Sequence, residues 1–226
     1  MLKAVIFDFD GVITDSEVIH FRTFNMVLEP FGVTLSKHEY YANYLGLSDL
    51  DLIKQLIAEG RLDIGNGEVE ELCRQKNKAF EKLMKEDGNI IDGVREFLNR
   101  LRKNDILMAI CSGALLSEIM LILEDARISG FFETVVSADQ VKKGKPHPDG
   151  FLLAMKRLDK KHNLDIKPAD CVVVEDSRWG LQAAKAAGMH SLAITNSYDA
   201  GELKIAEKIV DHLNEVTIDM LREICA

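Results

Sequence analysis

Residues 1–11 read Met-Leu-Lys-Ala-Val-Ile-Phe-Asp-Phe-Asp-Gly, an apolar run that ends in two carboxylates. The run from Ala4 to Phe7 is rich in β-branched and aromatic residues, which predicts a short strand buried on both faces. If the extended backbone continued, Asp8 and Asp10 would share one face, and Gly11 would then end the strand. Two anions this close together need a cation or a shared proton. The same pattern also fits a simple acidic turn at a strand end, so its interpretation depends on the rest of the chain.

The composition is that of an ordinary globular protein. The 226 residues, 47% of them hydrophobic and 29% charged, are enough for one large domain or for a domain plus a smaller one. The net charge of -9 and the dispersed lysines and arginines argue against a nucleic acid or an anionic membrane as partner. The four cysteines form no C-x-x-C pair and suit a reducing compartment. The short apolar run before Asp8 fits neither a signal peptide nor a membrane span. We expect a cytoplasmic protein that is a monomer or a weak dimer.

A helical pattern follows Gly11. Apolar residues at three- and four-residue steps predict helices over residues 18–31, 45–57 and 69–84, with Gly32 ending the first and Ser48 capping the second. The next strand candidate does not come until residue 106, whereas a parallel crossover needs only a dozen residues or more. We therefore predict a helical cap domain over residues 14–88, inserted into a core domain made of residues 1–13 and 89–226.

Helices and strands alternate after residue 92. The predicted helices cover residues 94–103, 115–123, 151–160 and 180–187, and the predicted strands cover residues 106–111, 134–137, 171–174 and 191–194. This alternation predicts an α/β fold, a Rossmann-like parallel sheet with helices on both faces. Ligands of such sheets bind beyond the carboxyl ends of the strands. The residues at those ends are the candidates for a functional site.

Polar side chains follow three further strands. Ser112-Gly113 comes after the second strand, Lys145 lies in the loop after the third, and Glu175-Asp176 ends the fourth. Each also has a simple structural interpretation. Ser112 fits a helix cap, Lys145 fits a solvated surface charge, and Glu175-Asp176 fits a pair of acids that complements the dipole of the following helix. One shared site explains their recurrence at strand ends better than three coincidences do. Together with Asp8, they are the groups needed to bind a metal and a phosphoryl group.

These four motifs, in this order and with the helical insertion after the first, resemble the haloacid dehalogenase superfamily of phosphatases and phosphomutases. The resemblance implies that Asp8 is a nucleophile that forms an aspartyl phosphate. It implies that Asp10 is the general acid and then the general base, and that Lys145 neutralises charge and orients Asp8. Ser112 and the Gly113 amide would hold phosphoryl oxygens. The metal would be Mg²⁺, bound through Asp8, the backbone carbonyl of Asp10, Asp176, and Glu175 as a ligand or as its support.

The resemblance leaves two reactions open. An acid at Asp10 favours phosphoryl transfer over dehalogenation, and the residues from Asp8 to Arg22, including His20, are similar to β-phosphoglucomutases. The mutase pattern also has a lysine and an arginine in the cap loop, where this chain has Leu45 and Asp49. We therefore predict a Mg²⁺-dependent phosphatase for a small phosphorylated metabolite, such as a sugar phosphate or phosphoglycolate. A hexose-phosphate mutase is the alternative.

The remaining residues to be placed are in the cap and beside the fourth motif. His20, Gly46 and Ser48 are expected to meet the part of the substrate that carries no phosphate, and Trp179 is expected to pack at a helix start.

A phospho-acceptor signalling module also combines an acidic cluster with a serine and a lysine on a parallel sheet. The insertion behind the first strand and the second acid, Asp10, argue against such a module.

Overall fold

The computed structural model describes residues 1–45, 47–87 and 90–226, with only the backbone at residues 66 and 84–87. The chain divides into two compact units. We call them the α/β unit, which combines Met1–Asp15 with Asn89–Ala226, and the helical unit, Ser16–Gly88. Each is described by itself below.

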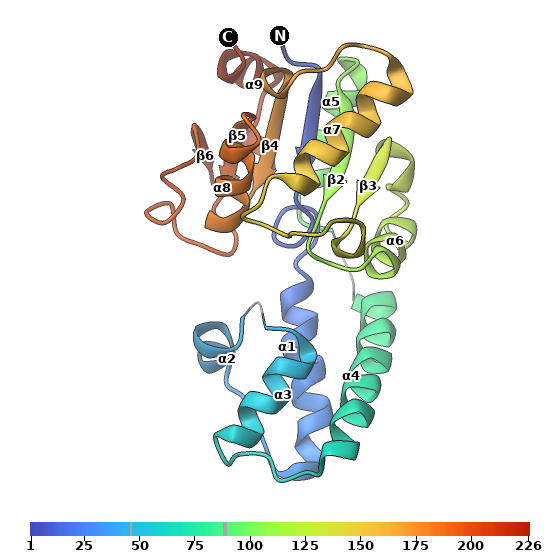
Figure 1. Ribbon diagram of the computed structural model, residues 1–226, viewed down its shortest axis with the longest axis vertical. Coiled ribbons are helices and arrows are strands. Elements are labelled where there is room, and N and C mark those ends of the chain that lie inside the picture. Colours follow the sequence, from blue (N-terminus) through green and yellow to red (C-terminus); the bar gives the residue numbers. More distant parts are fainter. Residues whose placement is uncertain (46, 88–89) are drawn as a thin grey trace. The chain divides into compact units, whose positions relative to one another are not determined.

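The α/β unit is built on a six-stranded sheet, in which the strands run in the order β3-β2-β1-β4-β5-β6 (Figure 1). All neighbouring strands pair in parallel, and Phe7 in the first strand lies in register with Ile110 on one side and Val174 on the other. The strands are β1 (Ala4–Phe7), β2 (Leu107–Cys111), β3 (Thr134–Val136), β4 (Cys171–Glu175), β5 (His190–Ile194) and β6 (Lys208–Val210). The predicted parallel α/β fold is therefore confirmed.

Helices connect these strands and cover both faces of the sheet. They are α5 (Val94–Lys103), α6 (Leu116–Asp125), α7 (Asp149–His162), α8 (Arg178–Ala186) and α9 (Ile218–Ile224), with short 3₁₀ turns at Ser129–Phe131, Ala138–Gln140, Pro168–Asp170 and Leu213–Glu215. Buried side chains of α7 and α8 pack with Ala4 and Ile6 of β1 in one cluster. The alternate residue Phe7 meets Phe97 of α5 edge to face, with ring centroids 5.8 Å apart. Because β1 is fully buried on both faces, it is a rigid base for the residues that follow it.

Two details of the α/β unit differ from the sequence prediction. Extended backbone stops at Phe7, so Asp8 and Asp10 do not continue a strand; a turn follows, in which Gly11 adopts a φ of 78°. This left-handed conformation suits glycine and redirects the chain within three residues. The strand β6 and the helix α9 were missed, since three residues and seven residues give too little periodicity to recognise.

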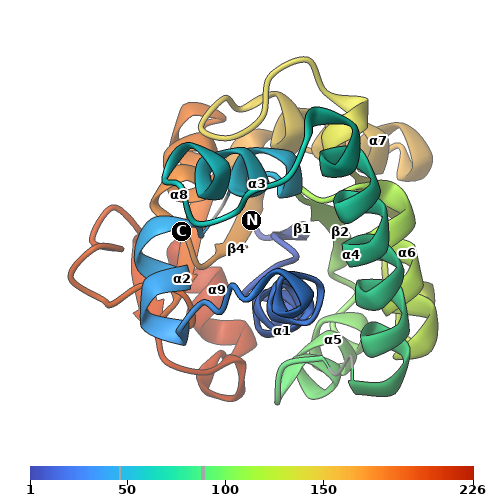
Figure 2. The same ribbon diagram turned by 90° about the horizontal axis from the view of Figure 1, so that it is seen from below.

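The helical unit consists of α1 (Ser16–Leu28), a 3₁₀ turn (Glu29–Phe31), α2 (Lys37–Asn43), α3 (Asp49–Ala58) and α4 (Asn66–Asp87). Helices α1 and α4 pack along each other, and α2 lies on the other side of α1 (Figure 2). Their apolar faces form one core around Phe24, Tyr40, Leu52 and Leu72. Ser48 caps α3, as predicted, by accepting a hydrogen bond from the Asp51 amide. The missed helix α2 begins with a capping box between Ser36 and Glu39, which is a recognisable sequence signal.

Within the residues that the structure describes, every helix is too short or too polar to cross a membrane.

Candidate active site

The carboxyl ends of three adjacent strands bring the predicted motifs together. Strand β1 lies between β2 and β4, so Asp8, which follows β1, stands between Ser112, which follows β2, and Glu175, which ends β4. The Asp8 amide donates a hydrogen bond to the Val174 carbonyl, and the Ser112 amide donates one to Val136. Sheet hydrogen bonds therefore hold these residues in place up to the edge of the site.

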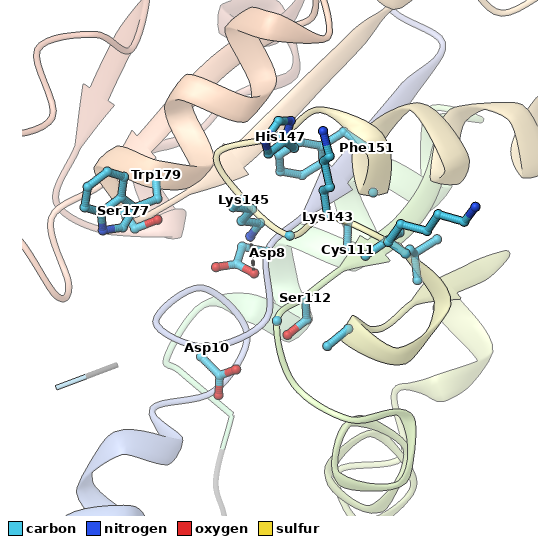
Figure 3. A pocket seen from close by; sticks show the side chains of 17 residues that line it. Asp8, Asp10, Cys111, Ser112, Lys143, Lys145, His147, Phe151, Ser177 and Trp179 are labelled. Carbon is cyan, nitrogen blue, oxygen red and sulfur yellow. Dashed lines mark ion pairs between the residues drawn. The ribbon is translucent and has the colours of Figure 1, made fainter. Parts of the chain in front are cut away.

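Lys145 joins two of the acids. Its ammonium nitrogen lies 2.6 Å from Asp8 Oδ1 and 2.5 Å from Glu175 Oε1 (Figure 3). Burial and the nearby Glu175 charge raise the pKa of Asp8, and Lys145 opposes this increase. Burial disfavours the ammonium of Lys145, but the charges of Asp8 and Glu175 outweigh it and raise the lysine pKa. The three groups thus form one charge-paired unit, as expected where buried charges cannot be left alone.

Glu175 is fully buried and both of its carboxylate oxygens are engaged. While Oε1 meets Lys145, Oε2 accepts hydrogen bonds from the Asp176 amide at 3.0 Å and from the amide and hydroxyl of Ser177 at 2.8 Å each. A Cβ at Gly180 would lie 1.6 Å from Oε1, so only glycine lets α8 approach this closely. Glu175 is therefore held rigidly between Lys145 and the start of α8.

Asp176 completes an acidic cluster. Asp8, Glu175 and Asp176 each place a carboxylate oxygen within 4.8 Å of the others. Burial, and then the Glu175 charge, raise the pKa of Asp176 to about 7, despite a hydrogen bond with Ser197 and the charge of Lys145. A Cβ at Gly11 would lie 1.7 Å from Asp176 Oδ2. One ammonium does not compensate three buried carboxylates, so the cluster fits a hard divalent cation with oxygen ligands.

The other predicted groups of the α/β unit line the same cavity. Asp10, Ser112 and Gly113 border it together with Asp8 and Lys145, and its volume is about 550 Å³. The Ser112 hydroxyl oxygen accepts the Ala114 amide at 2.9 Å, which leaves its proton available to a ligand oxygen. In Figure 3 the Asp10 carboxylate points away from Asp8. Burial raises the pKa of the neighbouring Cys111 thiol to about 12, which argues against a reactive thiolate in this cavity.

The model of the haloacid dehalogenase-like hydrolase family matches residues 5–194. The chain belongs to this family. It is 29% identical to the β-phosphoglucomutase of Bacillus subtilis, over 98% of this chain and 95% of the relative. It is 31% identical to the phosphoglycolate phosphatase of Nitrosospira multiformis, over 88% and 86% of the two chains.

A solved structure agrees with this assignment. The β-phosphoglucomutase of Clostridium difficile superimposes with a TM-score of 0.78 at 25% sequence identity, covering all of this chain and 97% of the other. The haloacid dehalogenase-like family thus accounts for both the sequence and the fold, and the chain is an enzyme of that hydrolase family. The relatives include phosphatases and a mutase, so membership in the family does not by itself select the reaction.

The helical unit carries the other predicted residues of this family member. His20 lies 2.6 Å, through Nδ1, from the Nζ atom of Lys76, and Lys76 lies 2.7 Å from Asp49 Oδ1. Burial, and then the Lys76 charge, lower the pKa of His20 to about 3, so the imidazole is neutral. The Ser48 hydroxyl donates to Asp51 at 2.6 Å and also caps α3. Gly46 lies outside the described residues.

Sequence reasoning missed supporting residues in each of the two units: Ser177 and Ser197 in the α/β unit and Lys76 in the helical unit. Ser177 supports Glu175, Ser197 contacts Asp176, and Lys76 is 1% exposed against the rings of Phe24 and Phe80. Ser177 could have been recognised as the N-cap of α8. Lys76 occupies a position of the apolar stripe formed by Val69, Leu72 and Phe80, and a lysine there signals a buried partner. Ser197 follows no pattern that we recognise.

Proposed function

We propose that the protein is a Mg²⁺-dependent phosphatase that hydrolyses a small phosphorylated metabolite, of the sugar phosphate or phosphoglycolate class, through an aspartyl phosphate. The observation that carries this proposal is the ion-paired arrangement of Asp8, Lys145 and Glu175, with Asp176 in reach at the ends of adjacent strands. Such a cluster combines a fixed carboxylate nucleophile with the positive charge that a phosphoryl group requires.

Asp8 is the proposed nucleophile. Because its Oδ1 is held by Lys145 at 2.6 Å, its other carboxylate oxygen is the atom that attacks phosphorus. The new bond joins Asp8 to phosphorus while the bond from phosphorus to the leaving oxygen breaks. Burial and the Glu175 charge raise the pKa of Asp8, and Lys145 opposes this increase, so the lysine helps to keep the carboxylate ionised for attack.

Asp10 is the proposed acid and base. It donates a proton to the leaving oxygen in the first step. In the second step it accepts a proton from the water that attacks phosphorus and releases Asp8. Its carboxylate points away from Asp8 in Figure 3, so this role requires its side chain to rotate toward the cavity that it lines.

Ser112 and Gly113 are the proposed ligands of the phosphoryl oxygens. The Ser112 side chain is fixed by the Ala114 amide, so its hydroxyl proton has a defined direction. Gly113 borders the same cavity and carries no side chain to block a close approach of its backbone. Lys145 faces the same region and offsets the charge that develops on the oxygens.

The cation itself is part of the proposal. Asp8 and Asp176 would hold it, together with the backbone carbonyl of Asp10, while Glu175 supports Asp176 and Lys145. A bound Mg²⁺ would supply positive charge that stabilises the phosphoryl oxygens. Oxygen-only donors favour this hard cation over zinc.

The mutase alternative is favoured by one observation in the helical unit. The sequence lacks a cation in the cap loop beside His20, yet Lys76 of α4 supplies one at 2.6 Å. However, Asp49 stands where the mutase pattern has an arginine, and it pairs with this same lysine. This pairing leaves less positive charge for a second phosphate, and phosphate release therefore stays the preferred reaction.

The two reactions are separated by one assay. A panel of phosphorylated metabolites is incubated with the enzyme and Mg²⁺, and both free phosphate and isomerised sugar phosphate are measured, with and without a hexose bisphosphate. We expect catalytic phosphate release that stops in EDTA and in Asp8→Asn. Isomerisation without phosphate release would establish the mutase instead, and stoichiometric rather than catalytic release would indicate a phospho-acceptor module.

A further inference from the structure

Trp179 is an exposed aromatic residue in the wall of the catalytic cavity. Its side chain is 49% exposed, and it lines the same cavity as Asp8 and Ser112. The sequence analysis expected this residue to pack at the start of a helix. Trp179 does lie at the start of α8, but about half of its surface is open to solvent. A large aromatic side chain that stays open to solvent next to a reactive centre marks a surface suited to a ligand.

Trp179 lies next to the residues that support the acidic cluster. Trp179 is the second residue of α8, whose N-cap Ser177 accepts the Gly180 amide at 3.1 Å and donates its hydroxyl to Glu175 at 2.8 Å. The Arg178 guanidinium lies 4.9 Å from the centre of the indole ring. Ser177 therefore links the first turn of α8, which carries Trp179, to Glu175 of the acidic cluster.

The cavity is larger than a phosphoryl group requires. Its volume of about 550 Å³ falls in the range of sites that take a whole small molecule. In Figure 3, Trp179 and Ser177 lie on one side of Asp8, and Lys143 and Phe151 lie on the other. A phosphate ester bound at Asp8 and Ser112 thus has room for its leaving group beside the indole.

We propose that Trp179 selects the leaving group, by stacking its indole on the ring of a phosphorylated sugar. This inference rests on the proposed phosphatase function and narrows its substrate class. The C–H bonds on one face of a sugar ring form dispersion and electrostatic contacts with an aromatic face. An acyclic acid such as glycolate has no such face, so the enzyme discriminates ring-containing phosphate esters from acyclic ones.

The fluorescence of this residue gives a direct test, because Trp179 is the only tryptophan in the sequence. The Asp8→Asn variant, which cannot turn over, is titrated in Mg²⁺ with glucose 6-phosphate, 2-phosphoglycolate or inorganic phosphate, and calorimetry follows binding in parallel. We expect a saturable change in Trp179 emission with glucose 6-phosphate alone. An equal change with inorganic phosphate would overturn the inference, because the indole would then report phosphate binding in general. Binding of 2-phosphoglycolate in preference to the sugar phosphate would overturn it as well.

Kinetics of the active enzyme give a second test. Trp179→Ala should lower kcat/KM for the sugar phosphate relative to acetyl phosphate by about three- to tenfold, the value of one aromatic contact, and Trp179→Phe should retain most of the preference. Phe131→Ala is the matched control. Phe131 also lies against an arginine, with the guanidinium carbon of Arg102 3.6 Å from the ring centre, but it does not line this cavity. An equal loss on both substrates would show that Trp179 only supports the fold. Absence of turnover by the unmodified protein on every phosphate ester would instead refute the phosphatase proposal itself.

Discussion

Replacing Asp176 by asparagine should make the metal-free protein more stable, although it removes a proposed metal ligand. Asp176 is 3% exposed, and it lies beside Glu175 and Asp8 with Lys145 as their shared positive charge. Asparagine keeps nearly the same shape but carries no charge. The substitution therefore removes a repulsion without leaving a large cavity.

The size of the effect follows from the pKa of Asp176. An increase of that pKa from 3.8 to about 7 corresponds, at 1.36 kcal/mol per pH unit, to roughly 4 kcal/mol. The carboxyl binds its proton more tightly in the folded state, so its contribution lowers stability as the pH rises above 3.8 and is complete above about pH 7. Near pH 4 the variant and the unmodified protein should be about equally stable. At pH 8 the variant should be more stable by up to about 4 kcal/mol, or about 8–16 °C in Tm for a protein of this length.

The assay is thermal unfolding in EDTA between pH 4 and pH 8. Glu202→Gln, at an exposed position of the α/β unit, is the matched control and should change Tm little at any pH. Added Mg²⁺ should raise the Tm of the unmodified protein and narrow its difference from Asp176→Asn. If Asp176→Asn were no more stable than the unmodified protein at pH 8 in EDTA, the charge repulsion inferred for this cluster would be wrong.

Three further predictions concern single positions. Asp10→Ala should lower kcat by roughly 10² to 10⁴ while leaving Tm nearly unchanged, and an unaltered rate in steady-state assays would remove Asp10 from the mechanism. Gly11→Ala should abolish phosphatase activity and lower Tm, because φ at this position is 78° and a Cβ would lie 1.7 Å from Asp176 Oδ2; full activity would show that the turn relaxes at little cost. Asp49→Asn should destabilise the protein by about 3 kcal/mol in urea unfolding, since it leaves the buried Lys76 without its carboxylate, whereas Asp51→Asn, at an exposed position of the same helix, should cost less than about 1 kcal/mol.

Much of the α/β unit could be predicted from the sequence because its elements are long and strongly patterned. The helix predicted over residues 94–103 agrees with α5, which spans Val94–Lys103, and each of the predicted strands lies within about two residues of an observed one. The same patterns did not reveal that the strand ends at Phe7 and that a turn follows before Asp10. The turn there depends on Gly11, which adopts a left-handed conformation and lies so close to Asp176, from a distant strand end, that a Cβ would not fit.

The site could be predicted only as far as its groups follow strands. Asp8, Ser112 and Glu175 each come directly after or at the end of a buried strand, and parallel strands place such residues at one edge. Lys145 comes from a loop, and its pairing with two acids depends on how that loop folds back. The cluster of His20, Asp49 and Lys76 joins three helices, and the spacing of residues along one helix says nothing about such a meeting.

The charges of the site also predict an order in which the proposed ligands bind. Asp8, Glu175 and Asp176 place three carboxylates around the single ammonium of Lys145, which is already paired with two of them. A phosphate monoester brings further negative charge into this buried region, so repulsion opposes its entry while the acids remain uncompensated. A divalent cation held by these carboxylates would offset that repulsion and would supply positive charge to the phosphoryl oxygens. We therefore expect the affinity for phosphate to depend on the cation, and we expect the pairing of Lys145 with both Asp8 and Glu175 to hold the proposed nucleophile in position until substrate arrives.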